Sequence, residues 1–112
     1  MKKLLFVLFL LIAGNVNAQI VLIPKDASGT VGTSYKAVLP SQPAREYLLI
    51  ENGSASNYMA FTYDNTVPVV NGAGSITLAP YQIYNADSAW VPTGGINVIG
   101  SGSGTVYTVK YR

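Results

Sequence analysis

The stretch Arg45–Asp64, REYLLIENGSASNYMAFTYD, decides the fold that we predict for this chain. It contains two apolar runs, Tyr47–Ile50 and Tyr58–Tyr63, separated by the turn-forming residues Asn52–Asn57. We interpret this pattern as a β-hairpin whose polar connection is too long for a two-residue turn. The first run is largely apolar on both faces, which predicts a central strand covered on both sides. The second run alternates more regularly and predicts a half-buried strand.

Short strands separated by Gly, Pro, Asn or Ser continue through the rest of the chain. The further candidate strands are Gln19–Pro24, Thr30–Leu39, Val67–Val70, Ser75–Leu78, Tyr81–Tyr84, Ile96–Ile99 and Thr105–Arg112. We interpret the last two as a hairpin with a flexible tip at Gly100–Gly104, and Asn85–Gly95 as the longest polar connection. No segment of the mature chain has the apolar spacing of a helix. We therefore predict an all-β fold, a small antiparallel β-sandwich or barrel of seven to eight short strands.

The first residues have the pattern of an export signal. Lys2 and Lys3 are followed by the apolar run Leu4–Ala13 and by small residues at Val16–Ala18. This predicts a cleavable signal peptide over residues 1–18. The alternative is that the segment stays uncleaved as a membrane anchor, which would be the chain's only contact with a membrane. The apolar run Leu4–Ala13 is shorter than the roughly 20 apolar residues that a spanning helix needs. We expect an exported protein, either periplasmic, extracellular or virion-associated.

A proline-rich break divides the mature chain. Pro40 and Pro43 prevent continuous sheet or helix between them. We expect residues 19–44 to form an N-terminal arm of edge strands and residues 45–112 to form the β-sandwich core.

Composition limits the chemistry of the mature chain. Without residues 1–18, five basic and five acidic side chains remain, so nucleic acid is not an expected partner. The chain has no His and no Cys, which removes the commonest general base, the thiolate nucleophile and the usual transition-metal ligands. We predict no catalytic, cofactor-binding or metal-binding residues and no enzyme. Asp26–Gly29 and Asp64–Thr66 offer oxygen ligands for Ca²⁺, but we interpret them as capped turns.

The absence of Cys also bears on partners. A small exported domain without disulfides is held by its apolar core or by burying surface against other subunits. Its balanced charge reduces self-repulsion and favours association. We expect protein partners, either copies of this chain or capsid or surface proteins.

Four aromatic residues are candidates for a binding surface. Tyr58, Tyr81, Tyr84 and Trp90 could form a platform for sugar rings, which would make a glycan the partner. The alternative is that Tyr is simply a favoured strand residue with a buried ring and a solvated hydroxyl. Trp90 lies in a loop beside Pro92 and could instead plug the end of the sandwich.

Three short segments carry a family resemblance: Arg45–Asn52 (REYLLIEN), Ile76–Pro80 (ITLAP) and Val91–Ile96 (VPTGGI). Their order, with an aromatic strand after the first segment and closing strands after the last, resembles small capsid-associated β-sandwich proteins of tailed bacteriophages, of the accessory or decoration type. The resemblance covers residues 45–112 and implies a β-sandwich fold and a non-enzymatic structural role in the virion. The export signal departs from this pattern unless the virus particle contains membrane or buds through it.

Two functional hypotheses follow. In the first, the chain is a virion structural protein whose arm, residues 19–39, docks on neighbouring subunits. In the second, it is an exported bacterial adhesion or carbohydrate-binding module that uses Trp90 and neighbouring Tyr residues.

Overall fold

The computed structural model describes residues 23–87 and 90–112, which form nine strands and no helix. The strands are β1 (Lys25–Asp26), β2 (Gly29–Val31), β3 (Lys36–Leu39), β4 (Tyr47–Asn52), β5 (Met59–Thr62), β6 (Ile76–Leu78), β7 (Ile83–Asp87), β8 (Ile96–Gly100) and β9 (Thr105–Tyr111). Accordingly, these two ranges contain no helix that could cross a membrane. The predicted signal peptide lies outside the described residues.

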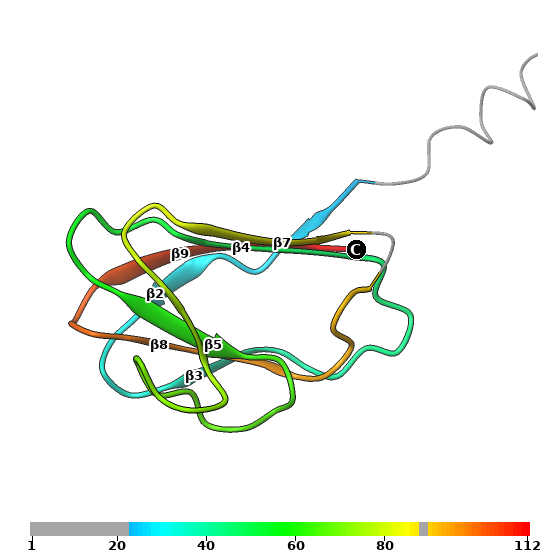
Figure 1. Ribbon diagram of the computed structural model, residues 1–112. Coiled ribbons are helices and arrows are strands. Elements are labelled where there is room, and N and C mark those ends of the chain that lie inside the picture. Colours follow the sequence, from blue (N-terminus) through cyan, green and yellow to red (C-terminus); the bar gives the residue numbers. More distant parts are fainter. Residues whose placement is uncertain (1–22, 88–89) are drawn as a thin grey trace, which may run out of the picture.

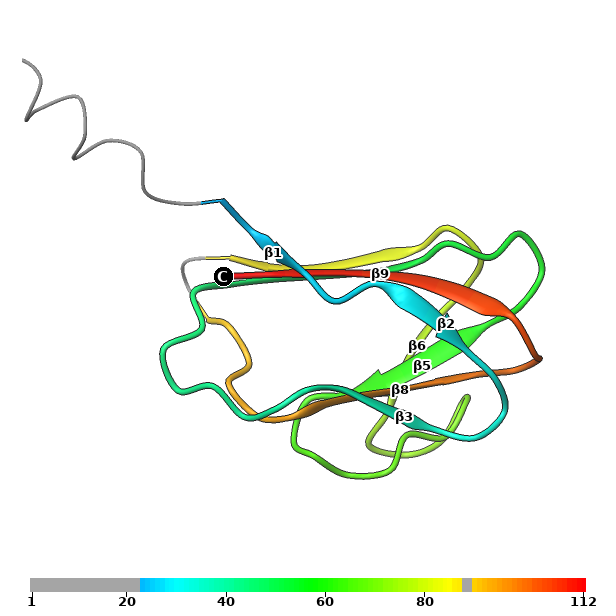
Figure 2. The same ribbon diagram turned by 180° about the vertical axis from the view of Figure 1, so that it is seen from behind.

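The strands form two antiparallel sheets that face each other across an apolar core (Figures 1 and 2). In sheet A, β9 pairs with both β1 and β2 on one side and with β4 on the other, and β7 follows β4. Sheet B has the order β3-β8-β5-β6. The prediction of an all-β antiparallel sandwich is confirmed. The strand count exceeds the predicted number, and two of the nine strands are the short β1 and β2, which lie along successive parts of β9.

The two predicted hairpins are wrong. Strand β4 pairs with β7 and β9, whereas β5 pairs with β6 and β8, so the first hairpin is instead a connection between sheets. Likewise β8 lies in sheet B and β9 in sheet A, and Gly100–Gly104 crosses between them. Both pairs of strands bury their apolar faces against each other across the sandwich, about 10 Å apart, and do not lie side by side.

The side chain of Asn52 holds the first of these crossings. Its Nδ2 atom donates hydrogen bonds to the carbonyls of Asn57 at 2.7 Å and Leu78 at 3.0 Å. Its Oδ1 atom accepts a hydrogen bond from the backbone N–H of Ser54 at 3.0 Å. Asn52 is fully buried. These bonds link the end of β4 to the crossing segment and to β6, which explains why this polar residue ends an apolar strand.

The sequence predicts that the first strand is covered on both faces and the second is half-buried, and the structure shows the reverse for β4 and β5. Strand β4 alternates buried and half-buried residues, whereas all four residues of β5 are buried. The reason is the segment after β5, which folds over the outer side of sheet B, the side turned away from sheet A (Figure 1). Thr62 Oγ1 and Asn97 Nδ2 both donate to the carbonyl of Thr66, at 2.6 and 2.9 Å, and Pro68 is buried. No comparable segment within the described ranges covers the outer face of β4.

The core is built from the inward residues of both sheets. Among them, the side chains of Phe61, Ile96 and Val98 from sheet B meet those of Leu48, Ile50, Tyr107 and Val109 from sheet A, as the alternation along the strands requires. Phe61 lies edge-on to Tyr84, with 5.1 Å between the ring centroids.

Some strand boundaries differ from the prediction. The predicted strand Tyr81–Tyr84 is displaced to β7, because Tyr81 has a φ of 62° and lies in a turn. Its N–H donates to the Asn52 carbonyl at 2.8 Å. The predicted polar connection Asn85–Gly95 therefore begins inside a strand, and Val67–Val70 forms no strand. Residues 25–39 pair with β9 and β8 of their own chain.

Candidate functional site

Arg45 organises one end of the sandwich. It lies just before β4, and only 5% of its surface is exposed. Its Nη1 atom donates to the carbonyls of Pro92 at 2.7 Å and Gly94 at 3.0 Å, and its Nη2 atom donates to the carbonyl of Pro40 at 2.9 Å. Burial lowers the pKa of Arg45, but a guanidinium stays protonated at neutral pH because its ordinary pKa is above 12. A cation is therefore held inside this end by carbonyl dipoles.

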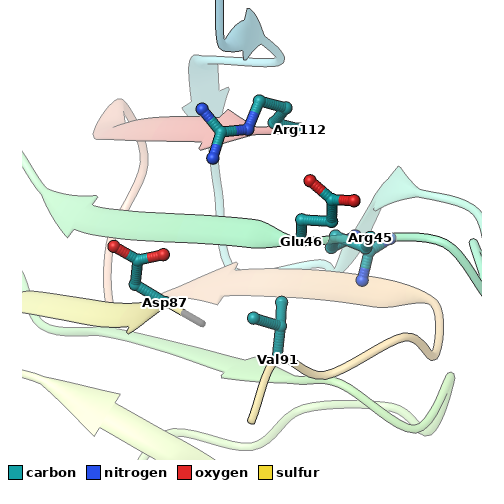
Figure 3. Close-up of a pocket in the computed structure, with 5 residues that line it drawn as sticks. All are labelled: Arg45, Glu46, Asp87, Val91 and Arg112. Carbon is teal, nitrogen blue, oxygen red and sulfur yellow. The ribbon is translucent and has the colours of Figure 1, made fainter. Parts of the chain in front are cut away.

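A hollow of about 400 Å³ lies beside Arg45 (Figure 3). The residues that line it are Arg45, Glu46, Asp87, Val91 and Arg112. In Figure 3 the guanidinium of Arg112 and the carboxylates of Glu46 and Asp87 face a common space, whereas the Arg45 guanidinium points away toward the loops. The ends of β4, β7 and β9 thus bring four charged side chains together.

The charged groups of this hollow are not paired with one another at close range. Within the described ranges, the ion pair closer than 4.0 Å joins Lys110 and Asp26, on the outer face of sheet A. Arg112 stands 6.0 Å from the ring centroid of Tyr47, and its Nε atom is buried without a hydrogen-bond partner. The hollow thus offers a guanidinium and two carboxylates to charged or polar groups of a partner. Among the described residues, its lining contains no hydroxyl or imidazole group for nucleophilic chemistry.

The four predicted aromatic site residues do not form one platform. Tyr58 and Tyr81 lie at the Asn52 end of the sandwich, where 46% and 64% of their surfaces are exposed. Tyr84 points inward and packs on the core, and this burial, with a smaller effect of Tyr63, raises the pKa of its hydroxyl. Trp90 lies near the opposite end, just before Val91 of the hollow.

Trp90 has a partner that the sequence did not indicate. Its ring lies edge-on to that of Tyr63, with 5.6 Å between centroids, while 62% of the residue is exposed. In the segment between Trp90 and β8, Gly94 packs on the Tyr63 carbonyl so closely that a Cβ atom there would collide with it. A large aromatic side chain is therefore held against Tyr63 while most of its surface stays exposed.

The two candidate Ca²⁺ turns have their own hydrogen bonds. Asp26 Oδ1 accepts from the N–H and hydroxyl of Ser28, and Asp64 Oδ1 accepts from the N–H and hydroxyl of Thr66. The Ser28 bonds, together with Lys110, lower the pKa of Asp26 to about 2, and the Thr66 bonds lower that of Asp64. In the part of the chain that the structure describes, no group of three His, Cys, Asp or Glu residues gathers to hold a metal ion.

Comparison with known proteins yields no family, no curated protein and no solved structure that matches this chain.

Sequence reasoning missed the residues that define both ends of the sandwich. Arg45 and Asn52 both lie within the stretch Arg45–Asp64. The signal that could have identified them is their position, because a charged residue precedes the apolar strand and an amide residue ends it. The hollow could not be found in this way, because Glu46, Asp87 and Arg112 come from three strands or strand ends that only the fold brings together.

Proposed function

We propose that this chain is a non-enzymatic structural protein, a capsid-associated accessory component of a bacteriophage virion, that acts through protein–protein contacts. The observation that carries the proposal is the exposure of large apolar side chains on a chain whose mature charges balance. Those residues are Ile23, Tyr35, Tyr58, Val67, Val69, Tyr81, Ile83, Trp90 and Val106. Exposed apolar surface combined with little self-repulsion favours association with other protein surfaces.

The three segments that carry the family resemblance are physically connected, which supports the proposal. Arg45, at the start of the first segment, donates to the carbonyls of Pro92 and Gly94 in the third. Asn52, at its end, donates to the carbonyl of Leu78 in the second. Two buried side chains thus join all three segments into one scaffold. The residues that join the segments are buried, so the exposed residues around them are free to suit a particular partner.

Export forms part of the same proposal. A capsid-associated protein with a signal peptide fits a particle that contains membrane or buds through it. The mass of the protein recovered from the producing cells tests this, because cleavage after Ala18 gives a chain that starts at Gln19. A chain that retains Met1 after secretion would contradict the cleavage.

Fractionation of particles tests the virion role. The tagged chain would be produced in cells that make the virus, and the released particles banded by density-gradient centrifugation. We expect the chain in the particle band at a fixed ratio to the capsid protein, including after a high-salt wash. Recovery of the chain only in the soluble fractions would refute the proposal.

The exposure of Trp90 favours a second candidate function, an exported adhesion or carbohydrate-binding module. A ring that packs against Tyr63 and keeps most of its surface exposed suits stacking on a sugar ring. A glycan array with wild-type protein and Trp90→Ala separates the two functions. Binding that the substitution abolishes would favour the module, and Tyr35→Ala, another exposed aromatic residue, is the matched control.

A further inference from the structure

We propose that β7 is a docking edge at which two copies of this chain pair antiparallel, so that their A sheets join into one continuous sheet. The starting observation is a difference among the four sheet edges. Natural sheets protect an open edge with Pro, charged residues, bulges, very short strands or a covering loop. Among the described residues, β7 has no Pro, bulge or covering loop, and its one charge, Asp87, stands at its end.

The other three edges are protected. On the far side of sheet A, the edge consists of two short strands, β1 and β2, with Lys25 and Asp26 in the first and Pro24 before it. In sheet B, β3 has Lys36, a register shift between Ala37 and Leu39, and Pro40 after it. Edge β6 is three residues long, and the adjoining loop reaches it through the bond from the Asn71 N–H to Thr77 Oγ1, at 2.9 Å.

Strand β7 is longer and regular. All five of its residues pair with β4 in unbroken register, and no other described strand pairs with it. It contains neither Pro nor a basic residue, and its one charge, Asp87, stands at its end. Ile83, with 51% of its surface exposed, and Asn85 face outward, while Ala86 is buried.

The hydrogen bonds of sheet A show which backbone groups of β7 are free to pair. Tyr47 exchanges backbone hydrogen bonds with Arg112, and the N–H of Asn52 donates to the carbonyl of Gln82. Because bonding alternates along an antiparallel strand, Tyr84 and Ala86 bond to β4. The N–H and C=O groups of Ile83, Asn85 and Asp87 therefore point to the open edge.

One register satisfies these groups, and it is symmetric. A two-fold axis at Asn85 places Asn85 opposite its own copy and Ile83 opposite Asp87 of the second copy, giving about six backbone hydrogen bonds, two for each facing pair. On the inner face, Tyr84 then stands opposite the small Ala86 of the second copy. On the outer face, the two Asp87 carboxylates lie at opposite ends of the ribbon. This register fits a large side chain beside a small one on the inner face and keeps the two like charges apart, which is the reason to name a second copy as the occupant.

This pairing deepens the proposed function by naming one protein partner, and it rests on that proposal only in treating the chain as an interaction protein. The two can fail separately. Sedimentation of the purified chain tests the dimer, whereas particle fractionation tests the virion role.

Charge substitutions at the two-fold axis test the dimer in the full chain, purified after export. In sedimentation equilibrium we expect a reversible monomer–dimer equilibrium for the wild type. Asn85→Lys and Asn85→Asp each place like charges directly opposite one another, which should raise the dissociation constant about tenfold. An equimolar mixture of the two variants places unlike charges there and should restore dimerisation. Asn85 is exposed, so the circular dichroism spectrum should stay unchanged. The thermal midpoint should also stay unchanged when it is measured below the dissociation constant of the wild type, where all these proteins are monomers.

A matched variant separates edge pairing from a general effect of charge. Ala37→Lys adds the same charge at an exposed position of β3 and should leave dimerisation unchanged. A wild-type chain that stays monomeric up to about 1 mM would overturn the proposal. So would equal weakening by Ala37→Lys and Asn85→Lys, or a mixture of the two Asn85 variants that remains monomeric.

Discussion

The two ends of the sandwich are each organised by one buried polar side chain from the same stretch of sequence, but their chemistry differs. Arg45, just before β4, binds three carbonyls with a buried cation and leaves its Nε atom without a partner. Asn52, at the end of β4, uses both its amide nitrogen and its amide oxygen. The difference teaches that a buried amide can be fully satisfied by its own loop and one neighbouring strand. A buried guanidinium draws in carbonyls from several segments and stands beside a charged hollow.

The largest expected effect is at Arg45. Arg45→Met keeps much of the side-chain volume but leaves the carbonyls of Pro40, Pro92 and Gly94 without their donor. Because an unsatisfied buried acceptor costs about 1 kcal/mol or more, the free energy of unfolding should fall by about 3 kcal/mol, as measured by urea denaturation. Arg45→Lys keeps the charge but not the fork of donors, and should recover only part of the loss. Full stability of Arg45→Met would show that the loops hold this end without it.

At the neutral end, Asn52→Ala should cost about 2 kcal/mol, somewhat less than Arg45→Met, because fewer carbonyls lose their donor. The same urea titration measures it. Asn57→Ala is the control, since its side chain makes longer bonds, at 3.2 and 3.4 Å, and lies nearer the surface. If Asn57→Ala proved as destabilising as Asn52→Ala, the crossing would not depend on the buried amide.

The turn beside Asn52 provides a smaller test of the same end. Tyr81 has a φ of 62°, a region in which a side chain with a Cβ atom is strained by about 1 kcal/mol. Tyr81→Gly should therefore be more stable than Tyr81→Ala by about 1 kcal/mol, although both lose the same aromatic ring. Thermal unfolding of the two variants measures the difference. Equal midpoints would mean that the turn relaxes to another backbone conformation when the ring is removed.

Acid should act on the charged end, and this effect is the smallest. The pKa of Asp26, about 2 in the folded chain, lies below the ordinary value of 3.8. Its contribution to stability is therefore present above about pH 4 and is lost as the pH falls through about 2. The thermal midpoint of the wild type should drop in this window more steeply than that of Asp26→Asn. Lys110→Gln keeps the Ser28 bonds and should lie between them. Parallel curves for all three proteins would contradict the assignment.

Local pattern was enough to identify the all-β class. Alternating apolar residues, frequent turn residues and the lack of helical spacing are properties of short segments. Each segment therefore predicts its own secondary structure without reference to the rest of the chain. The same pattern placed β4, β5, β8 and β9 to within two residues at each end. Tyr58, Tyr81 and Trp90, three of the four candidate residues for a binding surface, are exposed in the structure. Tyr84, of the same residue type, packs on the core, and nothing local distinguishes it.

Pairing was decided only by the tertiary structure. Two apolar strands that follow each other can lie side by side or face each other across a core, and their alternation is the same in both cases. The choice depends on what covers each face. For β5 this is the segment around Thr66 and Pro68, which follows the strand and folds back over it. For the crossing after β4 it is the carbonyl of Leu78, in a strand far along the chain.

The sequence by itself thus determined that this chain folds as a small all-β protein. The fold alone decided which strands share a sheet, that Arg45 and Asn52 join three separate segments, and that among the described strands only β4 pairs with β7. The physical reason is that the alternation along a strand shows which side chains become buried. Which strands and loops bury them depends on how the whole chain folds.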